Sequence, residues 1–278
     1  MERSRVKPNR TWPCVVFIDL DSTILRGPFE SAVFPVVLAE LAIKSSLDVK
    51  EARRQVFQEY LDRQKTPGIP AALAVDWDDI LDTVAARLGV RLEAKAVEIA
   101  NSHAGPPYSA VLDDAGQVLQ SLVDPQRAIV VATKGLRKYQ LPVLDALGLT
   151  PLFTDILTPD VHHALKQEAA FYGHWPRSTR LQISVGDYYE DDVEAPSRFG
   201  FKTVWKLDAP DGGLARADPF DRPIQFNYSS GQTTRPDAII LSLHELLQVV
   251  KCLEQQALVN HSDRRVSDER RQPVGEMR

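Results

Sequence analysis

Two acidic residues at the end of an apolar run are the residues of this sequence best placed to do chemistry. Asp19 and Asp21 stand two positions apart, directly after the apolar residues 14–18. Mg²⁺ prefers oxygen ligands and takes few of them from protein, so two carboxylates at one point suit this cation together with a reacting phosphate. The alternative is that these residues only end a strand and cap a helix.

Further polar features follow the acidic pair along the chain. They are Thr133, Lys166 and the acidic group Asp187, Asp191 and Asp192. Taken singly, they fit a helix N-cap, a solvated lysine and an acidic helix start that the helix dipole favours. Thr133 and Asp187, however, each come where an apolar run ends, as Asp19 does. Their joint order is much more specific than any one of them and indicates a single site.

The elements that must position these residues alternate between strands and helices. Apolar runs at residues 14–18, 128–132 and 181–185 predict buried strands, and weaker runs at 201–205 and 238–240 extend the series. Helical patterns of ordinary length separate them, which is typical of right-handed βαβ units on a parallel sheet. The carboxyl ends of such strands form the ligand-binding edge of the sheet. The sequence therefore predicts an α/β fold with a Rossmann-like parallel-sheet core.

A long helical stretch interrupts this alternation. Residues 29–102 show a helical pattern throughout and no convincing strand, so we expect residues 26–104 to form an all-helical domain inserted into a discontinuous core of residues 1–25 and 105–258. Lys166 is expected on a helix from about 163 to 172. Residues 208–236 are polar and rich in Gly and Pro, and their role is open. Residues 259–278 are almost devoid of apolar side chains, which predicts a disordered tail.

Composition limits the class of protein. The net charge of −5 and the pI of about 5.7 argue against nucleic acid as the main partner. No run approaches the roughly 20 apolar residues that cross a bilayer, and the basic start lacks the apolar core of a signal peptide. The distant pair Cys14 and Cys252 indicates neither a disulfide framework nor a zinc site. We expect a soluble, cytoplasmic protein of undetermined oligomeric state.

The four features together resemble the motifs of the haloacid dehalogenase superfamily. That family carries D-x-D-x-T, then Ser or Thr, then Lys, then G-D-x(3–4)-D, and the match covers about residues 15–205. The resemblance implies a Rossmann-like core with a helical cap between the first and second motifs. Two positions depart from the usual pattern. Gln167 follows the motif lysine where Pro is common, and Lys134 follows Thr133 where a small or amide residue is common.

The resemblance also implies a metal and its ligands. Mg²⁺ would be held by the Asp19 side chain, the backbone carbonyl of Asp21 and the carboxylate of Asp187. Asp192 would complete or orient that set, and Asp191 is the alternative because both spacings occur in the family. This cation would offset the repulsion between an attacking carboxylate and a phosphate dianion.

The resemblance assigns the remaining roles. Asp19 would be the nucleophile that forms an aspartyl-phosphate, and Lys166 would neutralise it between turnovers. Thr133 would hold phosphoryl oxygens. Asp21 would protonate the leaving oxygen and then deprotonate the hydrolytic water. Dehalogenase members need no acid at that position, so Asp21 favours phosphate-ester chemistry.

The function predicted from these residues is Mg²⁺-dependent hydrolysis of a phosphomonoester. A closed cap suits a small phosphorylated metabolite, such as a nucleoside monophosphate or a sugar phosphate, better than a phosphoprotein. A phosphomutase of the same superfamily would keep the same residues. A non-catalytic binding protein with this fold is a third possibility, against which the presence of both motif aspartates counts.

Overall fold

A parallel sheet forms the centre of the molecule. The computed structural model describes residues 12–208, 217–223 and 234–269. Six strands run in the order β5-β4-β1-β6-β7-β8, and every neighbouring pair is parallel. The strands are β1 (Trp12–Ile18), β4 (Arg127–Ala132), β5 (Asp155–Leu157), β6 (Thr179–Gly186), β7 (Lys202–Lys206) and β8 (Ala238–Ile240). This confirms the predicted α/β fold, with the first motif on a central strand.

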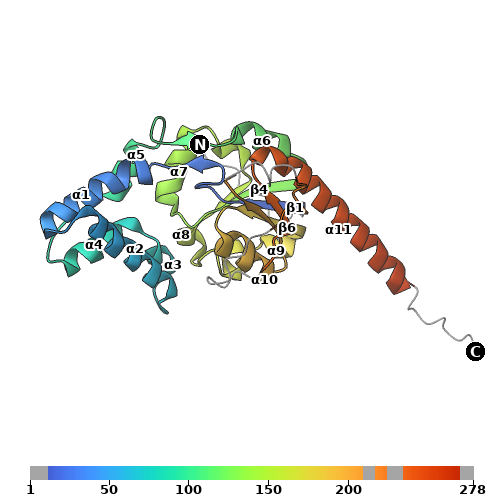
Figure 1. Ribbon diagram of the computed structural model, residues 1–278. Helices are drawn as coiled ribbons and strands as arrows, with labels where there is room; N and C mark the ends of the chain where they lie inside the picture. Colours follow the sequence, from blue (N-terminus) through green and yellow to red (C-terminus); the bar gives the residue numbers. More distant parts are fainter. Residues whose placement is uncertain (1–11, 209–216, 224–233, 270–278) are drawn as a thin grey trace, which may run out of the picture.

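Helices cover both faces of the sheet (Figure 1). Along β1, Cys14, Val16 and Ile18 belong to one hydrophobic cluster, and Val15 and Phe17 belong to another. The first cluster is completed by α6 (Ala115–Leu122), α7 (Arg137–Ala146) and α11 (Leu246–Glu269). The second includes side chains of a 3-10 turn (Ala169–Tyr172) and of α9 (Trp175–Ser178). Burial on both faces explains why the strands read as continuous apolar runs.

A helical block of residues 29–102 lies at one end of the molecule, at the left of Figure 1. It contains a π-helical turn (Phe29–Val33), α1 (Phe34–Ser45), α2 (Val49–Lys65), α3 (Ala71–Ala74), α4 (Trp77–Arg87) and α5 (Ala96–Ser102). Its buried apolar side chains form a cluster that includes none from the six-stranded sheet. The chain enters and leaves the block through two short antiparallel strands, β2 (Leu25–Arg26) and β3 (Ala110–Val111), which the sequence did not predict.

Polar side chains shape the helices of the block. Asp48 caps the start of α2 and Asp76 caps the start of α4, each by accepting a backbone N–H. The guanidinium of Arg63 on α2 is buried and reaches α4, where it donates to the carboxylate of Asp79 at 2.5 Å and to the hydroxyl of Thr83 at 2.7 Å. The two long helices are therefore tied together by a buried polar contact as well as by apolar packing.

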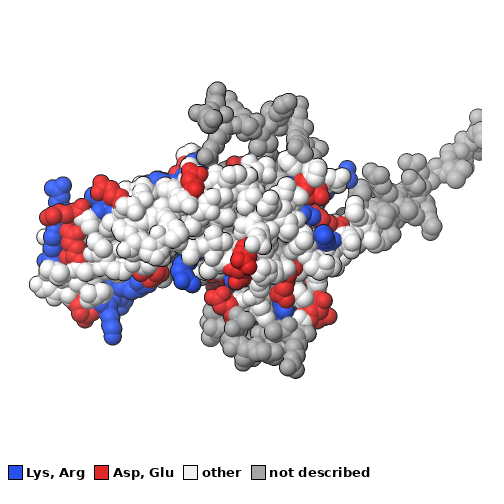
Figure 2. Space-filling view, turned by 90° about the horizontal axis from the view of Figure 1, so that it is seen from above, with Lys and Arg blue, Asp and Glu red and all other residues white. Residues whose placement is uncertain are grey.

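Figure 2 shows one face of the molecule, turned from the view of Figure 1. Lys and Arg side chains on the described part of this face lie among Asp and Glu side chains, as at the outer end of the helical block. Ion pairs within the helical block include Lys44 with Glu93 at 3.1 Å and Lys95 with Asp82 at 2.7 Å. None of the described helices combines the length and apolar character needed to cross a membrane.

Lys166 lies on a loop and not on the helix expected over 163–172. The structure has instead a short helix, α8 (Pro159–His162), and the 3-10 turn Ala169–Tyr172, with Lys166 between them. His163 ends α8 in the left-handed region at φ 53°, which stops helix propagation. The loop allows the side chain of Lys166 to point inward, whereas a helix on the surface would expose it.

The C-terminal helix is longer than the sequence suggested. α11 continues to Glu269 and projects away from the core (Figure 1), whereas residues from 259 onward were expected to be disordered. Low apolar content argues against burial but not against helix, and no Gly or Pro occurs from 259 until Pro273. Residues 270–278 lie outside the described residues, as does most of the segment 208–236.

A buried arginine attaches the described segment 217–223 to the core. Arg222 is 2% exposed and donates to both carboxylate oxygens of Glu245, at 2.7 and 2.6 Å. It also donates to the carbonyl of Ile239 on the edge strand β8, at 2.8 Å. Hydrogen bonds from Arg222 lower the pKa of Glu245. A bidentate pair of this kind is strong because the fork of the guanidinium matches the carboxylate.

We expect Glu245→Gln to lower the free energy of unfolding by about 2–3 kcal/mol, because buried Arg222 loses its carboxylate partner. Since the folded-state pKa of Glu245 is lowered, its contribution is present above the unfolded-state pKa and is lost as the pH falls through the folded-state value. Urea unfolding should therefore show a difference at pH 7 that shrinks below about pH 4.5. Glu194→Gln, in a half-exposed pair with Arg198, is the control and should change little. Equal effects of the two variants would contradict the expectation.

Candidate active site

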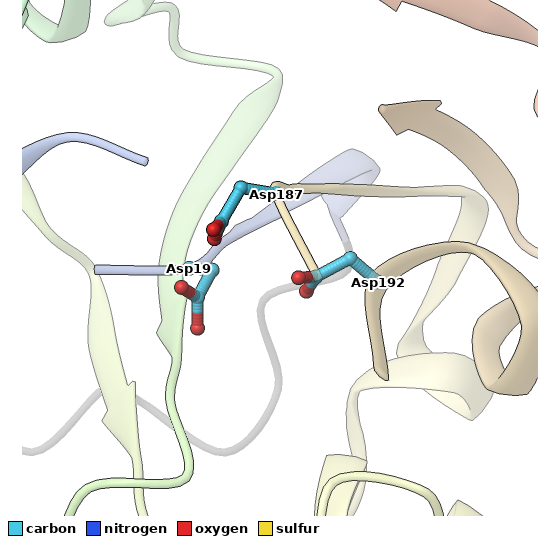
Figure 3. Close-up of side chains that lie close together, drawn as sticks. All are labelled: Asp19, Asp187 and Asp192. Carbon is cyan, nitrogen blue, oxygen red and sulfur yellow. The ribbon is translucent and has the colours of Figure 1, made fainter. Parts of the chain in front are cut away.

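Three carboxylates converge at the carboxyl edge of the sheet. Asp19 follows β1, Asp187 follows β6, and Asp192 lies on the π-helical turn Glu190–Glu194 just beyond. Each acid offers one carboxylate oxygen, and these three oxygens all lie within 4.8 Å of one another. Figure 3 shows the three side chains close together. The two strands are neighbours, and the backbone N–H of Asp19 donates to the carbonyl of Val185 at 2.9 Å. Strand pairing therefore places the first and last motifs side by side.

A buried lysine connects two of these carboxylates. Lys166 is 1% exposed, and its Nζ lies 2.7 Å from Oδ1 of Asp19 and 2.6 Å from Oδ1 of Asp192. Burial by itself would lower the pKa of Lys166, but the charges of Asp19 and Asp192 outweigh burial and raise it. The lysine is therefore held as a cation against the carboxylate that follows β1.

The position of Asp192 depends on a glycine. Asp192 is fully buried, and one of its oxygens accepts the backbone N–H of Tyr188 at 3.0 Å. A Cβ added at Gly186 would lie 2.1 Å from Cγ of Asp192, which no side chain tolerates. Gly186 is thus required for Asp192 to reach the other two acids. Burial raises the pKa of Asp192, and the neighbouring Lys166 opposes this effect.

The three acids fit a divalent cation. Burial, and next the charge of Asp19, raise the pKa of Asp187 to about 6, while a hydrogen bond from the Thr23 hydroxyl at 3.1 Å opposes the rise. Carboxylates crowded together and removed from water destabilise one another's charge, and a bound cation relieves this cost. Hard oxygen donors at such spacing are the ligand type that Mg²⁺ prefers.

Thr133 lines the same cavity as the acids. It follows β4, the other neighbour of β1, and is buried. Its hydroxyl accepts the backbone N–H of Gly135 at 3.1 Å, so the oxygen has a defined direction at the start of the loop. The structure therefore brings the residues of all four motifs to one place.

Asp21 has supports that the sequence did not reveal. The amide of Gln140 on α7 donates to its Oδ2 at 2.8 Å, and the backbone N–H of Gly27 bonds the same carboxylate. Although this carboxylate opens onto the cavity, protein surrounds it, and burial raises the pKa of Asp21 to about 6. A Cβ at Gly135 would lie 2.1 Å from the Gln140 amide, so Gly135 leaves room for this contact. A glutamine inside a helix carries no pattern by which it could have been found.

The site opens into a cavity of about 910 Å³ between the core and the helical block. The motif residues line one side of it. Aromatic side chains of the block line the other side, namely Phe29, Phe34, Phe57, Tyr60 and Trp77. Trp77 is the first residue of α4 and also lines the cavity.

This chain is similar to known proteins in its structure, but no sequence-based match was found. No family model matches this sequence, and no curated protein matches it. Solved structures do match. A HAD phosphatase from Thermococcus onnurineus has 23% identity and a TM-score of 0.61, over 85% of this chain and 97% of that one.

Two further structures have the same architecture. The protein YfnB of Bacillus subtilis, solved with bound magnesium, has 16% identity and a TM-score of 0.56 over 86% of this chain and 99% of that one. An L-2-haloacid dehalogenase from Xanthobacter autotrophicus has 17% identity and a TM-score of 0.54 over 86% and 98%. The chain has the haloacid dehalogenase fold. This confirms the fold implied by the order of the motifs.

The two departures from the haloacid dehalogenase pattern meet at a single residue. Lys134 Nζ lies 2.6 Å from Oδ2 of Asp191, and the amide of Gln167 donates to Oδ1 of the same carboxylate. Asp191 is thereby engaged away from the three converging acids, while the adjacent Asp192 joins them. The sequence left both Asp191 and Asp192 open as the last acid of the motif. In the structure, Asp192, at the longer spacing from Asp187, lies in the cluster of acids.

We expect Gly186→Ala to weaken divalent-cation binding by at least about tenfold, because a methyl group there displaces Asp192 from Asp19 and Asp187. Calorimetric titration of the purified protein with Mg²⁺ would measure the effect. Gly116→Ala is the matched control, since its Cβ would meet a neighbouring atom only at 3.8 Å. Unchanged Mg²⁺ affinity in a folded Gly186→Ala protein would show that Asp192 takes no part in the site.

Proposed function

We propose that this protein is a Mg²⁺-dependent phosphomonoester hydrolase that acts on a small phosphorylated metabolite through an aspartyl-phosphate. The observation that carries the proposal is the different support given to two carboxylates of one cavity. Asp19 lies against the buried ammonium of Lys166, whereas Asp21 is held by neutral donors from Gln140 and Gly27. A pair of acids in such different environments suits one nucleophile and one proton carrier.

In the first half of the reaction, an oxygen of Asp19 attacks phosphorus and the bond to the leaving oxygen breaks. Asp21 donates its proton to that leaving oxygen, which departs as an alcohol. In the second half, Asp21 takes a proton from water as the water attacks the phosphorus of the aspartyl-phosphate. Inorganic phosphate leaves and Asp19 is regenerated. The hydroxyl of Thr133 would hold a phosphoryl oxygen throughout.

Asp19, Asp187 and Asp192 would hold the metal with their side chains, and Asp21 would add its backbone carbonyl. The cation supplies positive charge between the attacking carboxylate and the phosphoryl group, which otherwise repel each other. The bound magnesium in the YfnB structure supports this choice of ion. Lys166 adds a fixed positive charge on the protein side of Asp19.

Phosphate-ester chemistry is favoured over dehalogenation because of Asp21. Matching structures include both a phosphatase and a dehalogenase, so the fold alone does not choose between them. Halide is a good leaving group and needs no proton, whereas an alkoxide needs one. A carboxyl group whose pKa is raised to about 6 supplies that proton near neutral pH.

We infer that residues 26–104, which contain the helical block, form a cap domain. It forms one wall of the cavity, and its hydrophobic cluster reaches the core mainly through Leu136 and Tyr139, which flank the start of α7. Caps of this kind exclude water from the reacting groups and leave limited room for substrate. The cavity volume of about 910 Å³ suits a metabolite such as a nucleoside monophosphate or a sugar phosphate.

The adjacent acids provide a matched test of the metal site. We expect Asp192→Asn to weaken Mg²⁺ binding and to raise the Mg²⁺ concentration needed for half-maximal phosphate release by about tenfold or more. Asp191→Asn should shift that concentration far less, because Asp191 faces Lys134 and Gln167. Activity should disappear in EDTA and return with Mg²⁺. Equal shifts in the two variants, or turnover in EDTA, would contradict the ligand set.

Substitution of the two motif aspartates tests the mechanism. Asp19→Asn should abolish release of phosphate from p-nitrophenyl phosphate, since the attacking charge is lost while the shape is kept. Asp21→Asn should lower turnover by about 10²–10⁴-fold, because general acid–base catalysis is lost. With p-nitrophenolate, a leaving group that needs little protonation, the second half should suffer more and phosphoenzyme should accumulate. Intact-mass measurement after rapid quenching would detect it. Normal turnover by Asp21→Asn would refute its role.

A further inference from the structure

The wall of the cavity that faces the acids is aromatic and only partly buried. Phe29, Phe57, Tyr60 and Trp77 belong to the hydrophobic cluster of the helical block, yet each keeps some exposure and each lines the cavity. Ligand-binding pockets are lined mostly by hydrophobic and aromatic side chains of this kind. These four present apolar surface to the space in which the proposed substrate would lie.

The rings of this aromatic wall hold one another in place. The ring of Tyr60 stacks on Trp77 with centroids 4.8 Å apart and an angle of 16° between the planes. Phe57 and Phe29 pack against the same Trp77 at 5.5 and 6.0 Å. Side chains fixed by their neighbours lose little freedom when a ligand binds, so the wall is a preorganised surface.

The aromatic wall begins close to the reacting groups. Phe29 comes two residues after Gly27, whose backbone N–H bonds Asp21, and two residues span at most about 7 Å. On the opposite side, Nζ of Lys134 lies 5.8 Å from the Tyr60 ring and 2.6 Å from Asp191. A phosphate at Asp19 would therefore point its leaving group toward these rings.

We propose that the cavity binds phosphate monoesters whose leaving group carries a planar aromatic ring, and that this ring packs against the wall formed by Phe29, Phe57, Tyr60 and Trp77. This inference rests on the proposed hydrolase function. A planar ring gains dispersion contacts and sheds apolar surface there. A plain sugar would instead set hydroxyl groups against rings that cannot replace their hydrogen bonds to water. The ring could belong to a nucleoside or to an aryl alcohol.

A matched series of substrates tests the preference. Phosphate release in Mg²⁺ would be measured for adenosine 5′-monophosphate against ribose 5-phosphate, and for 2-phenylethyl phosphate against propyl phosphate, whose alcohols are similarly poor leaving groups. We expect kcat/KM to be about tenfold or more higher for the ring-bearing member of at least one pair, as aromatic stacking contributes to binding. A preference in the first pair alone identifies a nucleoside, and in the second alone an aryl group. Equal values within both pairs would overturn the proposal.

A pair of tyrosine substitutions localises the effect. Tyr60→Leu keeps apolar volume but removes the flat ring, and should raise KM about tenfold more for the ring-bearing esters than for the ring-free ones. Tyr108→Leu is the control, because Tyr108 is 39% exposed and lies outside the cavity lining. Phe57→Leu replaces Tyr60→Leu if circular dichroism shows that the latter fails to fold. An equal loss across all esters would assign the ring a structural role and overturn the proposal.

A binding measurement separates this inference from the proposed reaction. Calorimetry on Asp19→Asn would compare 2-phenylethyl phosphate and adenosine 5′-monophosphate with ribose 5-phosphate, in the presence and absence of Tyr60→Leu. Tighter binding of a ring-bearing ester that Tyr60→Leu removes would support the aromatic site even if the unmodified protein hydrolysed no ester. Hydrolysis without any such difference in binding would retain the hydrolase and overturn the aromatic site.

Discussion

The contact of one buried ammonium with two carboxylates is the interaction on which the site depends. Among the described residues, Lys166 is the amine that lies against both Asp19 and Asp192. Removing two acids from water is costly, and a buried charge is tolerated only when an opposite charge is close. Lys166 offsets that cost on one side of Asp19, and a divalent cation between Asp19, Asp187 and Asp192 would offset it on the other. The loop that carries Lys166, the turn that carries Asp192 and the absence of a side chain at Gly186 all serve this arrangement.

A second polar contact links the core to the helical block across the cavity. Lys134, partly buried and paired with Asp191, reaches Oε1 of Gln64 on α2 at 3.3 Å and lies 4.7 Å from the ring of Tyr188. Lys134, one of the two residues that depart from the usual motifs, thus forms a contact between the two walls of the cavity. The residues at the sheet edge match the motif pattern, while Lys134 and Gln167, which depart from it, lie around Asp191 beside the cavity.

Much of the fold and part of the site could be predicted from local patterns. The apolar runs that form β1, β4 and β6 are buried on both faces, and such continuous apolar runs are typical of strands in a parallel sheet. The positions at which helices begin and end were predicted less well. The helix expected around Lys166 is broken because His163 adopts a left-handed conformation, and α11 runs past residue 258 because helix formation there does not need an apolar face. Neither outcome is visible in hydrophobic periodicity.

The sequence by itself determined that Asp19, Thr133 and Asp187 would meet, because residues that follow the strands of a parallel sheet must share its carboxyl edge. Only the tertiary structure placed Asp192, and not Asp191, beside Asp19 and Asp187, since one turn of backbone after β6 points Asp191 toward Lys134 and Asp192 toward Asp19. The hydrogen bond of Gln140 to Asp21 joins residues 119 positions apart. Such contacts depend on how helices pack on the sheet and how each side chain is turned, and no local pattern of residues encodes that.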